Sequence, residues 1–164
     1  MKATDIAELF NFPTNNPWIN TPLERYYTVG AKTKGVKGEE IAAAILKNLG
    51  YDVQPRTTPG HDRIVNGRKT EIKFSAASER NYKWQFTFNH IGFDKDWDDI
   101  IFVGVNGDLN IHIVRYTKEE LSTKCLSHQQ GGNTSSNDDF IIAGTKATDI
   151  LKGGECLLNG MEEM

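Results

Sequence analysis

Polar and apolar positions alternate one by one through residues 68–75, as in a β-strand that presents two different faces. Residues 62–65 are predicted to form a second, shorter strand. Between the two segments stands Asn66-Gly67, the dipeptide that best tolerates positive φ angles at both central positions of a tight hairpin turn. We therefore predict a β-hairpin here, with Glu71 and Lys73 on the same face of its longer strand.

Other stretches also have a period that predicts regular structure. In residues 38–49 apolar side chains recur at the i, i+3, i+4 spacing of a helix face, and Gly50 is a natural stop. The unbroken apolar run in residues 97–104 predicts a strand that is covered on both faces. The alternating segment 109–116 is its expected hairpin partner. Shorter strands are predicted over residues 51–54, 84–90 and 140–144.

The length of 164 residues is that of one domain, 1–164. We divide it into an N-terminal arm and basic loop, a core, and a C-terminal part, which span residues 1–35, 36–116 and 117–164. The C-terminal part is expected to contain a short helix, a polar loop over residues 122–139 and the last strand, followed by a frayed end from Gly153. Thr117 and Glu120 form a capping box for the short helix.

Several polar segments have the composition of a nucleic-acid contact. Residues 23–37 combine lysines with glycines and tyrosines, so we expect either a flexible basic loop against a phosphate backbone or an ordinary solvated loop. The loop expected over residues 76–83 adds basic side chains, and the segment 84–90 adds a polar row suited to base edges. The residues predicted to bind DNA are Lys32, Lys34, Lys37, Arg80, Lys83, Gln85, Asn89, His128 and Gln129.

The net charge of −3 is unevenly distributed. Residues 1–90 carry 13 basic and 9 acidic side chains, whereas residues 91–164 carry 6 and 13. A local positive field can steer a polyanion even when the total charge is negative. The charge therefore argues against a strong non-specific DNA binder, but not against an enzyme that acts on DNA.

The two cysteines, Cys125 and Cys156, lie far apart and lack the CxxC spacing of a metal site. We expect free thiols and a reducing, cytoplasmic setting. The sequence contains no apolar run near the roughly 18 residues of a membrane span, so no membrane association is expected.

The predicted hairpin concentrates charge on one face. Its turn brings Asp62 beside Glu71 and Lys73, which places two carboxylates and an ammonium together. Such a group is costly to bury unless it binds something, and a hard divalent cation between the carboxylates would offset that cost. Taken alone, a Glu-x-Lys pair on a strand is more often a solvated face. Glu39, at the start of the predicted helix, either reaches inward to this group or complements the helix dipole.

Together, Gly38-Glu39 at a helix start, Asp62, and Glu71-Ile72-Lys73 resemble the motifs of the PD-(D/E)xK nuclease superfamily. This superfamily includes type II restriction enzymes, junction resolvases and several phage nucleases. The resemblance covers about residues 36–115, and the spacing from Asp62 to Glu71 is within the range of the family. One departure is His61, which stands where the family motif has Pro.

The resemblance implies a mixed α/β fold of the restriction-endonuclease-like type, with a central mixed sheet of about four to five strands flanked by helices. It implies that the catalytic residues are Glu39, Asp62, Glu71 and Lys73. Asp62 and Glu71 would ligate Mg²⁺, for which Mn²⁺ can substitute, with the Ile72 carbonyl as a third ligand and Glu39 completing the site. Lys73 would orient or deprotonate the attacking water.

We therefore expect a Mg²⁺-dependent endonuclease that hydrolyses double-stranded DNA at a specific sequence, as a homodimer in which each subunit cuts one strand. Three alternatives stay open. They are a structure-specific nuclease such as a junction resolvase or phage recombination nuclease, a homing endonuclease, and a non-catalytic DNA-binding module on the same fold. A zinc enzyme is disfavoured, because no two of the four histidines stand at ligand spacing on one element.

Overall fold

The structure is a computed structural model that describes residues 18–56, 61–80, 83–124, 126–128 and 139–160. Its centre is a five-stranded mixed sheet with the strand order β1-β2-β6-β7-β10. These strands span Arg63–Val65, Arg68–Ala76, Asp99–Val105, Ile111–Thr117 and Glu155–Leu158. β2 and β6 are parallel, and the other neighbours are antiparallel. The mixed α/β class and the number of central strands are therefore as predicted.

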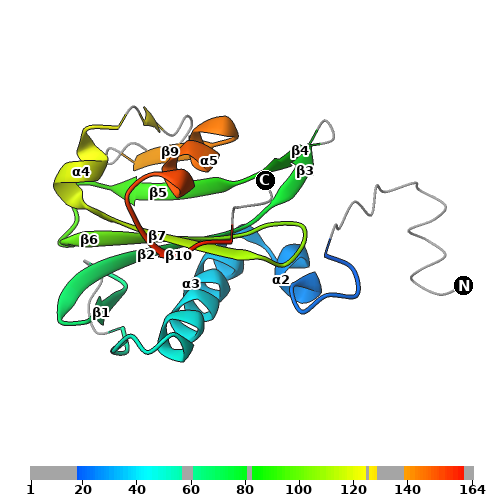
Figure 1. Ribbon diagram of the computed structural model, residues 1–164, viewed down its shortest axis with the longest axis horizontal. Helices are drawn as coiled ribbons and strands as arrows, with labels where there is room; N and C mark the ends of the chain where they lie inside the picture. Colours follow the sequence, from blue (N-terminus) through cyan, green and yellow to red (C-terminus); the bar gives the residue numbers. More distant parts are fainter. Residues whose placement is uncertain (1–17, 57–60, 81–82, 125, 129–138, 161–164) are drawn as a thin grey trace, which may run out of the picture.

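The central sheet is the middle of three layers (Figure 1). One face is covered by α3, Ala31–Asn48, through an apolar cluster that includes Leu46 and Ile72. The other face carries a second sheet with the order β5-β9-β8, together with the helix α5, Thr145–Lys152. The strands of this second sheet span Thr87–Gly92, Asp139–Ala143 and Ser127–His128. All of β6 is buried between the layers, as its unbroken apolar run predicts.

The β1–β2 hairpin forms at the predicted place. Asn66 and Gly67 both have positive φ angles, 48° and 79°, so the dipeptide supplies the turn conformation that its composition indicates. β1 is short and pairs with β2 only as far as Thr70. Beyond that residue, the side of β2 that faces away from β6 has no pairing with β1. This part of the edge contains Glu71, Ile72 and Lys73.

The helix α3 begins earlier than predicted, at Ala31 instead of Gly38. The sequence predicts a flexible loop over residues 31–37, because one glycine and three lysines interrupt their apolar pattern. They are helical because they extend a helix whose next residues pack on β2, and extending an existing helix costs much less than starting one. A short helix, α2 (Glu24–Thr28), precedes α3. The predicted boundary at residue 35 therefore falls inside a helix, and Glu39 lies well beyond its first turn.

Two other predicted elements differ locally from the structure. The predicted strand over residues 51–54 is reduced to one isolated bridge between Val53 and Val65. The predicted loop over residues 76–83 contributes instead to a hairpin of β3, Ser78–Arg80, and β4, Lys83–Gln85. The same hairpin splits the strand predicted over residues 84–90, because β4 ends at Gln85 and β5 starts at Thr87.

The C-terminal part contains more structure than predicted. Thr117 caps the helix α4, Lys118–Ser122, and its hydroxyl accepts a hydrogen bond from the Glu120 N–H at 3.2 Å, as the capping box predicts. β9 confirms the strand predicted near residue 140, but it is not the last one. α5 and β10 follow, and β10 pairs with β7 where a frayed end was expected. Most of the polar loop over residues 122–139 lies outside the described residues.

Among the helices of the described segments, none is both long enough and apolar enough to cross a membrane.

Two glycines of α3 provide a matched test of how closely this helix packs on β2. A Cβ atom on Gly38 would lie 3.0 Å from Phe74 Cβ and 3.3 Å from Tyr26 Oη, whereas a Cβ atom on Gly35 would have no neighbour within 4 Å. We expect Gly38→Ala to destabilise the protein, because overpacking of about 1–3 kcal/mol outweighs the gain in helix propensity. We expect Gly35→Ala to raise the free energy of unfolding by about 0.5–1 kcal/mol. Urea unfolding measures both, and equal effects would contradict the packing described here.

Candidate functional site

A cleft of about 570 Å³ opens where the first half of α3, the free edge of β2 and the strand β5 meet. Its walls contain all four residues that the sequence predicts to be catalytic. They are Glu39, Asp62, Glu71 and Lys73. The structure thus brings together residues from a helix, from the segment before β1 and from β2.

Glu71 and Lys73 project from the same face of β2, as their spacing predicts. Lys73 Nζ lies 2.8 Å from Glu71 Oε1, and the two side chains are only 16% and 6% exposed. Desolvation makes such a pair costly, and the attraction between its members must offset that cost. A largely buried ion pair on a strand edge is therefore weak evidence for stability alone and is better explained by a role in the cleft.

Asp62 takes the place of the missing strand pairing along the edge of β2. Its own N–H donates a hydrogen bond to the Thr70 carbonyl at 3.1 Å. Its carboxylate Oδ2 then accepts the Ile72 N–H at 2.8 Å. The N–H and C=O groups of one strand residue point to the same side, so the Ile72 carbonyl also faces this edge. Oxygen atoms of Asp62, Glu71 and Ile72 are therefore gathered at one end of the cleft.

The surroundings of the Asp62 carboxyl disfavour its charged form. Burial, the negative charge of Glu71 and, to a smaller extent, that of Glu39 together raise the pKa of Asp62 to about 6. The Ile72 N–H and the Lys73 ammonium act in the opposite direction but do not cancel this effect. The site therefore holds more negative charge than its own cations compensate.

Glu39 reaches inward from α3 and is 8% exposed, which agrees with the inward orientation and not with a role at the helix dipole. Its carboxylate accepts a hydrogen bond from the Arg63 guanidinium. Arg63 is a residue of the site that no sequence motif identifies. It could have been inferred from Glu39, because a buried carboxylate requires a cation beside it.

Among the described residues, no group of three or more His, Cys, Asp and Glu side chains forms a ready-made metal site. Glu71 is engaged by Lys73, and Glu39 by Arg63. The donors at the β2 edge nevertheless fit a hard cation, because they are two carboxylates and a carbonyl with excess negative charge.

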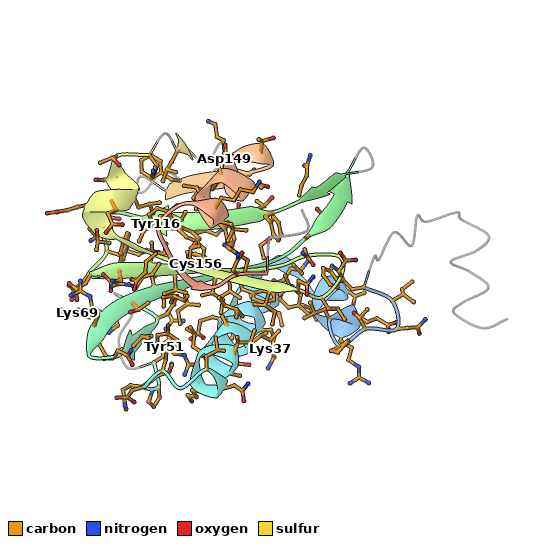
Figure 2. The ribbon with its side chains drawn as sticks, in the orientation of Figure 1. Lys37, Tyr51, Lys69, Tyr116, Asp149 and Cys156 are labelled. Atoms are coloured by element: carbon orange, nitrogen blue, oxygen red, sulfur yellow. The ribbon has the colours of Figure 1, made fainter. Side chains whose placement is uncertain are left out.

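The residues predicted to bind DNA are only partly brought to the cleft. Lys34, Gln85 and Asn89 line it, and the Lys34 ammonium lies 5.4 Å from the centre of the Tyr26 ring. Burial lowers the pKa of Lys34. Lys37 projects from α3 into solvent, as Figure 2 shows, and pairs with Glu40 at 3.1 Å.

The other predicted DNA contacts can be placed only by their backbone. Lys32 lies on α3, Arg80 on β3 and Lys83 on β4, while their side chains are not among the described parts. His128 lies on β8, which is separated from β5 by β9. Gln129 lies outside the described residues.

No protein-family model matches the sequence, and no curated protein is significantly similar to it. The geometry of the cleft is therefore the evidence for a function.

The raised pKa of Asp62 predicts how stability changes with pH. In the unfolded chain Asp62 ionises near its ordinary value of 3.8, but in the folded protein it ionises near 6. The folded state is therefore progressively penalised as the pH rises from about 4 through 6. In EDTA at pH 7, we expect the free energy of unfolding of Asp62→Asn to be about 1–3 kcal/mol higher than that of the wild type. Below pH 4, the two free energies of unfolding should be nearly equal. The exposed Asp108→Asn is the control, and a difference that did not grow between pH 4 and pH 6 would contradict the assignment.

Proposed function

We propose that this protein is a Mg²⁺-dependent endonuclease of the PD-(D/E)xK type that cuts DNA, built on a restriction-endonuclease-like core. One observation carries the proposal. Asp62, Glu71 and Lys73 meet in a cleft at the part of the β2 edge that β1 leaves free. This arrangement combines oxygen donors for a hard cation with an ammonium group beside them.

Asp62 and Glu71, with the Ile72 carbonyl, are the residues that would hold the metal. When bound, the metal supplies a water of lowered pKa and positive charge against the scissile phosphate. Lys73 orients the attacking water by hydrogen bonding, and its charge stabilises the negative charge that develops on the phosphate oxygens. Glu39, held by Arg63, adds a further carboxylate beside this group.

A DNA strand entering the cleft meets Lys34 on the α3 wall. Lys34 is partly buried, and burial lowers its pKa, so the negative charge of a phosphate beside it would favour the ammonium form. Gln85 and Asn89 on the opposite wall offer amide groups of the kind that read base edges. These features favour sequence-specific cleavage of double-stranded DNA. We propose in addition that a second copy of the chain cuts the other strand.

A second candidate is a DNA-binding module without catalytic activity. The observation that favours it is the charge pairing inside the cleft, because Lys73 and Arg63 already compensate Glu71 and Glu39. Metal binding separates the two candidates, since only the nuclease requires the carboxylates to exchange these partners for a cation.

Metal binding is expected to stabilise the folded protein. At ten times the dissociation constant, a ligand that binds only the folded state adds about 1.4 kcal/mol, so Mg²⁺ and Mn²⁺ should raise the midpoint of thermal unfolding. Glu71→Gln should abolish this rise. Glu40→Gln, which changes an exposed carboxylate on α3, should preserve it. A rise of equal size in the Glu71 variant would show that the cation binds elsewhere.

Cleavage is expected to require Lys73. With supercoiled plasmid and phage DNA as substrates, the wild type should produce discrete bands in Mg²⁺ and none in EDTA. Lys73→Ala should reduce the cleavage rate by about 100-fold or more. Lys69→Ala is the matched control, because Lys69 is on the same face of β2 but at the end of the sheet, where it pairs with Asp96 (Figure 2).

Other outcomes of this experiment have definite meanings. A smear identifies a non-specific nuclease, and cutting confined to branched DNA identifies a structure-specific one. If the wild type cuts no linear, supercoiled or branched DNA with either metal, the nuclease is excluded and the binding module is favoured. Full activity in Lys73→Ala would refute the assigned site.

A further inference from the structure

The strand β5 contains a β-bulge on the wall of the cleft. Asn89 and His90 lie between the paired positions Phe88 and Ile91, whereas the partner strand β9 has only one residue between its corresponding positions. Two residues of β5 thus stand opposite one residue of β9, which is the pattern of a bulge.

The bulge changes which side chains face the cleft. Phe88 and Ile91 are both buried, with 1% and 0% exposure. In a regular strand, residues three apart point to opposite faces, so one of the two would have to leave the core. The extra residue lets both point inward. As a result, Asn89 and His90 are consecutive and exposed, and both line the cleft.

His90 has the unusual backbone conformation that accompanies this bulge. Its φ angle is 58°, in the left-handed region that favours glycine. Among the non-glycine residues with positive φ in the described segments, His90 alone belongs to the walls of the cleft. Strained residues and bulges concentrate at functional sites, where they redirect side chains toward a ligand. A glycine would fit this backbone with less strain, so the imidazole is a feature that requires an explanation.

The two walls of the cleft differ in chemistry. The α3 wall presents the Lys34 ammonium over the Tyr26 ring, which suits a phosphate. The bulge presents the amide of Asn89 and the imidazole of His90, and each of these groups carries both a hydrogen-bond donor and an acceptor. These are groups that hydrogen-bond to base edges, and an amide can contact adenine at two atoms.

We propose that the bulge residues Asn89 and His90 read the bases of the DNA bound in the cleft and determine which sequence the enzyme prefers, while Lys34 contacts the phosphate backbone. This inference rests on the proposed function, because it assigns a substrate orientation within the same cleft. It separates recognition from catalysis, since the bulge belongs to the second sheet and the carboxylates lie at the edge of the central sheet.

The test compares base preference among variants of the full chain. The probe is a duplex DNA pool with a randomised segment, selected by binding in EDTA and separately by cleavage in Mg²⁺, and then sequenced. We expect the wild type to enrich a motif and His90→Gly to lose about tenfold discrimination at one or two positions of it. Asn89→Ala should relax the same or an adjacent position. Lys34→Ala should weaken binding to all sequences without changing the motif. It should also reduce the slope of log affinity against log salt concentration by the amount expected for about one phosphate contact.

Leu109→Gly is the matched control. Leu109 has a similar φ angle, 63°, but lies at the β6–β7 turn and is not part of the cleft wall, so its replacement relieves similar strain without affecting recognition. His90→Gly should have a midpoint of thermal unfolding equal to or above that of the wild type, because glycine accepts the backbone conformation. A lower midpoint would assign His90 a structural role and overturn the proposal.

The failure of this inference is distinguishable from failure of the proposed function. If the wild type cuts DNA but His90→Gly and Asn89→Ala retain its motif in both selections, the nuclease stands and the assigned recognition role is wrong. If the wild type neither binds nor cuts any member of the pool, both proposals are wrong. Loss of discrimination in His90→Gly, with cleavage chemistry retained on the remaining sequences, supports the assignment.

Discussion

The early end of the β1–β2 pairing is the constraint on which the candidate site depends. β1 pairs with β2 only through Thr70, and the next edge group, the Ile72 N–H, is satisfied by the Asp62 carboxylate. A side chain thus replaces backbone pairing at the edge of an otherwise ordered sheet. Because the carboxylate must sit at this edge to accept the hydrogen bond, it is also brought close to the Glu71 and Lys73 side chains.

The charges around this edge are balanced by two cations from different elements. Lys73 engages Glu71 within β2, and Arg63 links Glu39 of α3 to β1. Each pair lowers the cost of burying a carboxylate, but Asp62 keeps a raised pKa because burial and its acidic neighbours outweigh the Lys73 ammonium and the Ile72 N–H. In the protein without a metal, the buried Asp62 carboxylate is therefore incompletely compensated, and a bound cation would supply the missing positive charge. This residual negative charge is the physical basis for proposing a metal site, although the described residues hold no ready-made cluster of ligands.

The elements predicted correctly from sequence are those with local signals. Asn66-Gly67 specifies its own turn, and the apolar run of β6 needs cover on both faces wherever it lies in the fold. The predicted proximity of Asp62, Glu71 and Lys73 followed from this hairpin alone. The early start of α3 is not predicted, because the lysines and the glycine of its first two turns give a weak local pattern, and the helix continues there from the part that packs on β2.

The features missed at the site depend on pairing between distant segments. The bulge at Asn89 and His90 exists only because β5 pairs with β9, about 50 residues further along the chain. The Glu39–Arg63 pair requires α3 to lie against the hairpin. The periodicity of the sequence contains no information on which distant segments pair. It therefore identifies the polar row near residue 89, but not the extra residue that turns His90 toward the cleft.

The central claim is that a divalent cation binds at the β2 edge, and anomalous diffraction from crystals soaked in MnCl₂ tests it most directly. If the cation binds there, one strong manganese peak should lie within ligand distance of the Asp62 and Glu71 carboxylates, with the Lys73–Glu71 ion pair opened or rearranged. No peak in the cleft, with that ion pair intact at saturating manganese, would refute a metal site at the β2 edge.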